Sequence, residues 1–137
     1  MNWQFDHIAF NTPIQVPLHG LFGNLLNLTA GPRPPFRFPG SWLYQDQQAM
    51  VHVIERSDID QPALSHIALR TDADARQVMA RVKASGLPHG FSEVPQSDHL
   101  QIFVQLPAGL LLELLVPASN DPSLRDELIQ SGQLETA

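Results

Sequence analysis

The pattern of hydrophobic and polar positions occurs twice along the chain. Residues 3–10 are rich in aromatic and apolar side chains, which predicts a strand, and their motif Asp-His-Ile-Ala-Phe returns as Ser-His-Ile-Ala-Leu in the predicted strand 65–70. Each copy is followed by a further apolar strand, at 49–55 in the first and at 110–116 in the second. The chain is therefore predicted to consist of two copies of one structural unit.

The first copy is irregular between its two matching strands. Residues 11–13, Asn-Thr-Pro, predict a helix start with proline at the first helical position. Pro17 and Gly20 interrupt the segment that follows, so we expect a short or broken helix through 21–26. It is expected to end at Asn27, a residue type that tolerates a left-handed backbone. The four prolines of 31–40 do not suit an interior strand or helix, so this segment is predicted to be a shaped loop or an edge segment. A strand at 41–44 and a polar turn then lead into the strand at 49–55.

The second copy is more regular. Residues 71–74 resemble a capping box with Asp in place of Glu or Gln, and they predict a helix that ends at Gly86. Strands are expected at 91–94, 99–105 and 110–116, with a turn at 107–109. Each copy thus has a strand, a helix and then two or three strands, which we interpret as the order β-α-β-β-β. An amphipathic helix at about 121–130 follows the second copy.

The length bounds how these copies are organised. A chain of 137 residues can bury one solid core but not two independent domains. We expect a single α+β domain at 1–117, with module one at 1–58 and module two at 63–117 around the linker 58–62. Residues 118–137 are predicted to form a C-terminal helical tail.

Composition and charge narrow the function classes. Hydrophobic residues at 43% and charged residues at 16% are typical of a globular protein. The chain has no cysteine, so a bound metal must use nitrogen and oxygen ligands. The net charge of −6 disfavours nucleic acid as a partner, because such binding needs clustered Lys and Arg. No apolar run is long enough to span a membrane and the N-terminus does not resemble a signal peptide, so we expect a cytoplasmic protein.

Glu113 is the strongest single candidate for chemistry. It lies inside the apolar run Leu-Leu-Leu-Glu-Leu-Leu-Val, where an isolated ionised carboxylate is costly. Such a group is protonated, paired or bound to a cation. The structural alternative is a glutamate that reaches solvent from the edge of the strand.

Three histidines share the repeated pattern with Glu113. His7 and His66 hold the second position of the matching motifs, and a shared position implies a shared face of the strand. His52 follows His7 by 45 positions, and Glu113 follows His66 by 47, so His52 and Glu113 occupy corresponding strands. A single strand histidine is more often a core or surface residue than a ligand. A histidine that recurs at the same position of both copies is harder to explain by core packing alone.

These motifs resemble those of the vicinal oxygen chelate superfamily, which includes glyoxalases, bleomycin-resistance proteins and extradiol dioxygenases. The resemblance covers roughly residues 4–117, and its carriers are DHIAF and SHIAL, PGSWLY and VHVIE, QIFVQLPAG, and LLLELLVP. It implies a glyoxalase-like fold, a cup-shaped mixed sheet built from two β-α-β-β-β modules. It also implies one divalent metal ion, held by His7, His52, His66 and Glu113.

Two positions depart from the family pattern. The common Asp-Pro-Asp-Gly turn is Leu-Pro-Ala-Gly at 106–109, which affects local detail only. His52 stands where the four-ligand lyases of the family usually carry Glu or Gln, so it is either a fourth ligand or a free base beside a three-ligand site. Imidazole and carboxylate ligands suit Zn, Ni, Co, Fe or Mn better than Ca or Mg.

The substrate-binding candidates follow from strand parity and from charge. Trp42 precedes His52 by ten positions and Phe103 precedes Glu113 by ten, so each pair shares a face if the strands are hairpins. The same parity adds Tyr44 and Gln101. A guanidinium on the proline-rich segment could bind a substrate carboxylate, although solvation or core packing is the structural alternative for all these residues. The arginines concerned are Arg33 and Arg37.

The resemblance implies a metal-dependent enzyme that acts on a small molecule with two neighbouring oxygens. The first expectation is a lyase or an isomerase/epimerase in which the metal stabilises an enediolate and Glu113, or an unligated His52, moves the proton. The second is an extradiol-type ring-cleaving dioxygenase with Fe(II) on His7, His66 and Glu113, which an unligated His52 would favour. The non-enzymatic alternative is a metal-free drug-binding protein. We expect a homodimer.

Overall fold

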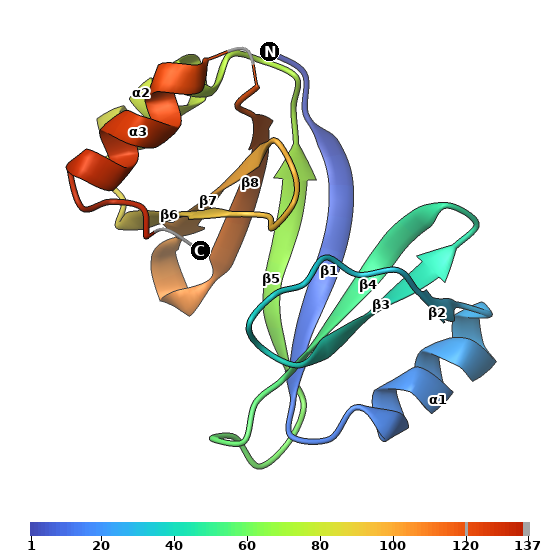
Figure 1. Ribbon diagram of the computed structural model, residues 1–137. Helices are drawn as coiled ribbons and strands as arrows, with labels where there is room; N and C mark the ends of the chain where they lie inside the picture. The colour runs from blue at the N-terminus through green and yellow to red at the C-terminus, as the bar shows by residue number, and fades with distance from the viewer. Residues whose placement is uncertain (120, 136–137) are drawn as a thin grey trace. The chain divides into compact units, whose positions relative to one another are not determined.

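The computed structural model describes residues 1–119 and 121–135 (Figure 1). The chain forms two compact units, one made of Asp6–Ile67 and one made of Met1–Phe5 with Ala68–Ala137. We call them the N-terminal unit and the C-terminal unit. In the described part of the chain, no helix has the length and apolar character needed to cross a membrane.

The N-terminal unit contains the first β-α-β-β-β module. Its strands hydrogen-bond in the order β2-β3-β4-β1, with β1 and β4 parallel and the other pairs antiparallel. A small core of leucine and valine side chains from α1, β3, β4 and the segment after α1 lies against the sheet: Leu18, Leu28, Leu43, Val51 and Val53. The elements are β1 (Gln4–Thr12), α1 (Val16–Leu26), β2 (Thr29–Gly31), β3 (Gly40–Gln45) and β4 (Gln48–Glu55).

Helix α1 begins after the predicted start at 11–13 but before the predicted short helix at 21–26, and the predicted interruption at Pro17 and Gly20 is wrong because both residues lie within the helix. Thr12 is the last residue of β1 and pairs with Glu55, so the chain stays extended through the predicted helix start at 11–13. The helix uses Pro17 in its first turn in place of Pro13. Its predicted end is confirmed, because Asn27 caps the helix with φ 58° and ψ 34° and its N–H reaches carbonyls of the last turn.

The C-terminal unit carries the larger core. Helices α2 and α3 lie together over strands β6 to β8 in Figure 1, and their apolar faces meet β7 and β8 in one cluster of buried side chains. Strand β5 begins in the N-terminal unit and ends in this one. The elements are β5 (Ala63–Arg70), α2 (Ala75–Ser85), β6 (His89–Glu93), β7 (His99–Gln105), the short 3-10 turn η1 (Pro107–Gly109), β8 (Leu111–Pro117) and α3 (Pro122–Gln130).

The predicted capping box at the start of α2 is wrong in detail. The N-cap is Asp74, whose carboxylate accepts the backbone N–H of Arg76, and the Thr71 hydroxyl instead accepts the N–H of Ala73. Gly86 ends the helix with φ 71°, as predicted.

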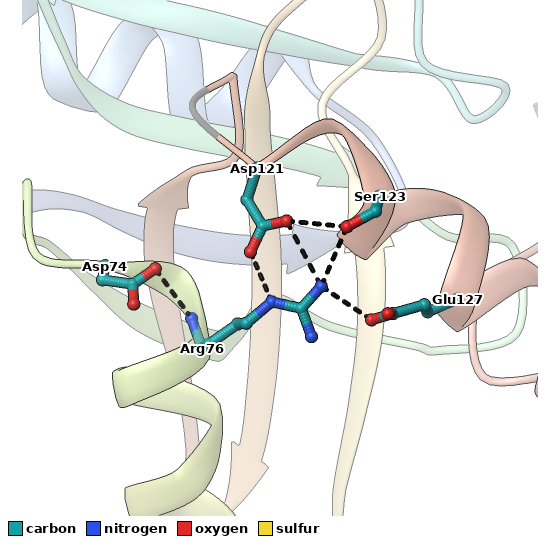
Figure 2. Close-up of polar contacts among 5 residues, drawn as sticks. All are labelled: Asp74, Arg76, Asp121, Ser123 and Glu127. Atoms are coloured by element: carbon teal, nitrogen blue, oxygen red, sulfur yellow. Dashed lines mark hydrogen bonds and ion pairs between the residues drawn. The ribbon is translucent and has the colours of Figure 1, made fainter.

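Arg76 connects α2 to α3. Its guanidinium donates to both carboxylate oxygens of Asp121 and to the hydroxyl of Ser123, and it pairs with Glu127 at 2.7 Å (Figure 2). These charge-assisted bonds raise the pKa of Arg76. Together with Leu124 and Leu128 in the core, they fix α3 on the C-terminal unit.

The predicted fold class is confirmed. All eight strands form one open mixed sheet in the order β2-β3-β4-β1-β5-β8-β7-β6, and the described residues contain two β-α-β-β-β modules. The short edge strand β2 is the element that sequence reasoning missed, because three residues before a run of prolines give no strand signal. The predicted module boundaries and the tail at 118–137 stay predictions, and residues 120, 136 and 137 of that tail lie outside the described residues.

Candidate metal centre

Strand β1 carries the first candidate ligand. His7 is 3% exposed, and its Nδ1 lies 2.6 Å from a carboxylate oxygen of the preceding residue, Asp6. Because the carboxylate accepts, the imidazole donates from Nδ1.

Strand β5 repeats this arrangement. His66 is 6% exposed, and its Nδ1 lies 2.9 Å from the hydroxyl oxygen of the preceding residue, Ser65. The His7 and His66 rings are 5.5 Å apart between centroids and meet at 75°. In both strands, therefore, the residue before the histidine contacts the same ring nitrogen.

His52 lies between two other rings of the N-terminal unit. On one side, the indole of Trp42 stacks on it with centroids 4.1 Å apart and planes 12° apart. On the other side, the imidazole of His7 stacks on it at 3.5 Å and 16°. The β-sheet register explains both contacts, since Trp42 pairs directly with His52 across β3 and β4, and His52 pairs with Ala9, two residues beyond His7 in β1.

The surroundings of His52 disfavour its charged form. Burial is the largest cause, and the neighbouring His7 adds to it, so that the pKa of His52 falls to about 2. Asp6 and a backbone hydrogen bond with Ala49 act in the opposite direction and are outweighed. His52 is therefore a neutral imidazole at ordinary pH.

Glu113 lies in the C-terminal unit on β8. It is 1% exposed, so the alternative of a strand-edge glutamate that reaches solvent is wrong. It pairs across the strands with Phe103 of β7, in the same way that His52 pairs with Trp42. Three of the four predicted ligands, His7, His66 and Glu113, are buried side chains that each offer one ligand atom to a metal ion.

The substrate-binding candidates of the N-terminal unit make contacts of their own. The Tyr44 hydroxyl donates to the carbonyl of Pro32, and its ring covers Gly31, where an added Cβ would lie 2.7 Å from it. The Arg33 guanidinium lies over the ring of Phe36 at 5.1 Å and over that of Phe38 at 5.0 Å. Burial lowers the pKa of Arg33 without making it neutral.

The remaining candidates are spread over two units. Gln101 is 8% exposed on β7 and pairs with Leu115, while Phe103 is half-buried. Arg37 is exposed. Their roles toward a substrate stay predictions.

Sequence reasoning missed the residues that support the histidines. Asp6 and Ser65 both precede a candidate ligand, and the repeated motif that revealed His7 and His66 contains them as well. Phe36 was not considered, although its ring lies 6.2 Å from that of Trp42. No periodic signal identifies it, because it lies in the proline-rich segment.

Comparison with known proteins supports the fold and leaves the activity open. No protein-family model and no curated protein sequence matches the chain. Among solved structures it resembles methylmalonyl-CoA epimerase from Mycobacterium tuberculosis, with a TM-score of 0.65 and 14% identity over 87% of this chain and 91% of that one. The epimerase from Streptomyces coelicolor in complex with 2-nitronate-propionyl-CoA gives a TM-score of 0.63 and 16% identity over 85% and 98%.

A second class of enzyme shares the fold. The 2,3-dioxygenase LapB from Pseudomonas sp. KL28 matches with a TM-score of 0.67 and 15% identity, over 83% of this chain and 40% of the dioxygenase. The chain therefore has the same glyoxalase-like fold as these enzymes. At these identities the likeness concerns the fold alone, and the activity must be argued from the site.

Proposed function

We propose that this protein is an enzyme that uses a divalent metal ion held by His7, His66 and Glu113. The donor set fits such an ion, because two imidazoles and one carboxylate are the ligands of many mononuclear transition-metal sites. All three side chains are buried, and each offers one ligand atom. A metal ion also offsets the cost of a carboxylate in an apolar strand.

The residues next to the histidines support this assignment. Asp6 and Ser65 contact Nδ1 of His7 and His66, so Nε2 of each ring is the ligand atom in the proposed site. A hydrogen bond to the non-ligating nitrogen fixes the tautomer and the orientation of a metal-bound histidine, and a carboxylate also raises its basicity.

The orientation of His52 supports one of the candidate reactions over the other. A metal ion lies close to the plane of the imidazole that binds it, in the direction of the nitrogen lone pair. The rings of His7 and His52 are stacked 3.5 Å apart at 16°, so one ion cannot lie in both planes. We therefore assign His52 a place beside the metal and three protein ligands to the metal itself.

Three ligands with a neighbouring neutral histidine favour the extradiol-type ring-cleaving dioxygenase. Fe(II) in such a site supplies open positions for the two oxygens of a catechol and for dioxygen. His52 carries no proton on one ring nitrogen, because burial lowers its pKa to about 2. It can therefore accept a hydrogen bond from a substrate hydroxyl.

The second candidate is an epimerase or lyase that moves a proton next to a carbonyl. The extent of the structural match favours it, since the chain covers 91% of one methylmalonyl-CoA epimerase and 40% of the dioxygenase. In this reaction a metal ion held by His7, His66 and Glu113 would supply Lewis-acid chemistry at the carbonyl oxygen, and Glu113 or His52 would accept the proton.

One set of measurements separates these candidates. Purified protein is stripped with a chelator and reloaded under anaerobic conditions with Fe(II), Co(II), Zn(II) or Mn(II), and bound metal is counted. Oxygen uptake with a series of catechols in the Fe(II) form supports the dioxygenase. Exchange of the α-proton of an acyl-CoA ester, with metals that do not activate oxygen, supports the epimerase.

The same experiment tests the metal site itself. About one equivalent of metal, lost in His66→Ala and Glu113→Ala, is the expected result. A protein that cannot be loaded with any of these ions overturns the proposal, and the metal-free drug-binding protein then becomes the better interpretation. Homodimer formation and a cytoplasmic location stay proposals, the first to be tested by light scattering.

A further inference from the structure

Three rings of the N-terminal unit are stacked in a series that ends at a proposed metal ligand. The indole of Trp42, the imidazole of His52 and the imidazole of His7 follow one another at 4.1 Å and 3.5 Å, with planes 12° and 16° apart. Both faces of the His52 ring are therefore covered. Rotation of this ring out of the stack requires one of its two neighbours to move.

The outer member of the series is itself braced. The ring of Phe36 lies 6.2 Å from that of Trp42 and stacks on Phe38 at 5.1 Å. The Arg33 guanidinium lies over both phenylalanine rings and donates to the carbonyl of Phe38 at 2.9 Å. The proline-rich segment thus lies next to Trp42 through the ring of Phe36.

Gly40 lets β3 follow this segment closely. A Cβ at Gly40 would lie 2.3 Å from the carbonyl oxygen of Val53 and 3.0 Å from the guanidinium of Arg33, so a side chain cannot fit there without a shift of the backbone. Two residues later, Trp42 stands directly opposite His52 in the register of β3 and β4.

We propose that Trp42 is a positioning residue that holds the His52 imidazole beside His7 and away from the metal. This inference rests on the proposed metal site. His52 has the chemistry of a ligand and lies against a ligand, so only its orientation keeps it out of the coordination sphere. When the indole is removed, one face of the His52 ring is open and the imidazole can turn toward the ion that His7 binds.

The test counts imidazoles on the metal. Wild-type protein and the Trp42→Ala and Trp42→Leu variants are loaded with Co(II) alone, and the number of bound imidazoles is measured by X-ray absorption, with metal affinity by titration. We expect two imidazoles in the wild type and three in both variants, with Co(II) bound at least about tenfold more tightly in the variants. The added His52→Ala substitution returns each variant to two.

Control variants separate positioning from general packing. Trp42→Phe keeps an aromatic plane over His52 and is expected to keep two imidazoles. Trp3→Phe replaces the other tryptophan of the chain, which precedes β1 and is 37% exposed, and is expected to change nothing. Thermal unfolding of the metal-free variants reports folding separately, because a merely structural tryptophan changes stability and leaves the imidazole count unchanged.

The outcomes are distinct. Two imidazoles and wild-type affinity in both Trp42→Ala and Trp42→Leu overturn the positioning role and leave the metal site intact. Three imidazoles in the wild type overturn it as well and restore the four-ligand site. A wild-type protein that binds no Co(II) overturns the proposed function and this inference together.

Discussion

The two modules place different chemistry at the same point of the same framework. In the N-terminal unit Trp42 pairs with His52 across β3 and β4, and in the C-terminal unit Phe103 pairs with Glu113 across β7 and β8. Each pair joins an aromatic residue to a candidate for chemistry. The repeated backbone determines the position of these side chains in the sheet. The residue type at that position then determines whether it supplies the carboxylate of Glu113 or the neutral imidazole of His52.

The cores of the two units differ as well. Eleven buried hydrophobic residues form the cluster of the C-terminal unit, and five form that of the N-terminal unit. Helix α1 leaves Val16 at 76% and Leu25 at 69% exposed, whereas α2 and α3 each bury an apolar face. The C-terminal unit is therefore the better packed half, and the N-terminal unit carries most of the candidate chemistry.

The largest expected effect is on metal affinity, and it tests whether Glu113 differs from His52, the residue at the corresponding position, in being a ligand. Glu113→Gln replaces an anionic ligand by a neutral amide, and we expect metal affinity to fall by more than about a hundredfold. This loss is larger than the loss of affinity when a residue that only hydrogen-bonds a ligand is substituted. Glu55→Gln, on the corresponding strand β4, is the control and should keep wild-type affinity. Metal titration of both variants measures these affinities. Equal metal affinities of Glu113→Gln and Glu55→Gln would mean that Glu113 is not a ligand.

The next effect compares the two cores. Ile102→Ala in the C-terminal unit is expected to lower the free energy of unfolding by about 4 kcal/mol, and Leu43→Ala in the N-terminal unit by about 2 kcal/mol. Both side chains are at most 2% exposed, so the difference comes from how far the surroundings can close the cavity. Urea unfolding followed by circular dichroism measures both values. A larger loss in Leu43→Ala would reverse the ranking of the two cores.

The third effect is a dependence of protein stability on pH that arises from the protonation of His52. Its pKa is about 2 in the folded protein and near 6.5 in the unfolded chain, so between these values the unfolded state binds one more proton. Stability therefore falls as the pH falls below 6.5, by about 2 kcal/mol between pH 7 and pH 5. Unfolding of metal-free protein at both pH values measures it.

Two variants assign this pH dependence to its residue. His52→Gln should lose most of it, because no imidazole remains at the position to be protonated on unfolding. His89→Asn, at an exposed histidine of β6, should keep it. A dependence that survives in His52→Gln would mean that other groups cause it.

The smallest effect compares the residues that support the two histidines. Asp6→Asn removes a charged acceptor from His7 and is expected to weaken metal binding by about tenfold. Ser65→Ala removes a neutral partner from His66 and should weaken it by less, because charge-assisted hydrogen bonds are stronger. Metal titration at constant pH ranks the two variants. The reverse ranking would contradict the proposed role of Asp6.

Local signals in the sequence predicted much of the fold. The caps at Asn27 and Gly86 ended their helices where expected, since a left-handed backbone favours these residue types wherever they occur. The start of α1 was predicted wrongly, because Thr12 pairs with Glu55, more than forty positions away. A helix-start motif of a few residues carries no information about a strand that pairs with it from more than forty positions away in the sequence.

For the site, the sequence by itself determined which residues carry ligand chemistry and that they recur in two copies. The spacing of His7, His52, His66 and Glu113 follows from the repeat alone. Only the tertiary structure decided how their rings face one another, and above all that His52 stacks between Trp42 and His7. Strand periodicity specifies the face from which a side chain projects, whereas the plane of an imidazole depends on contacts with other strands, and those exist only in the folded protein.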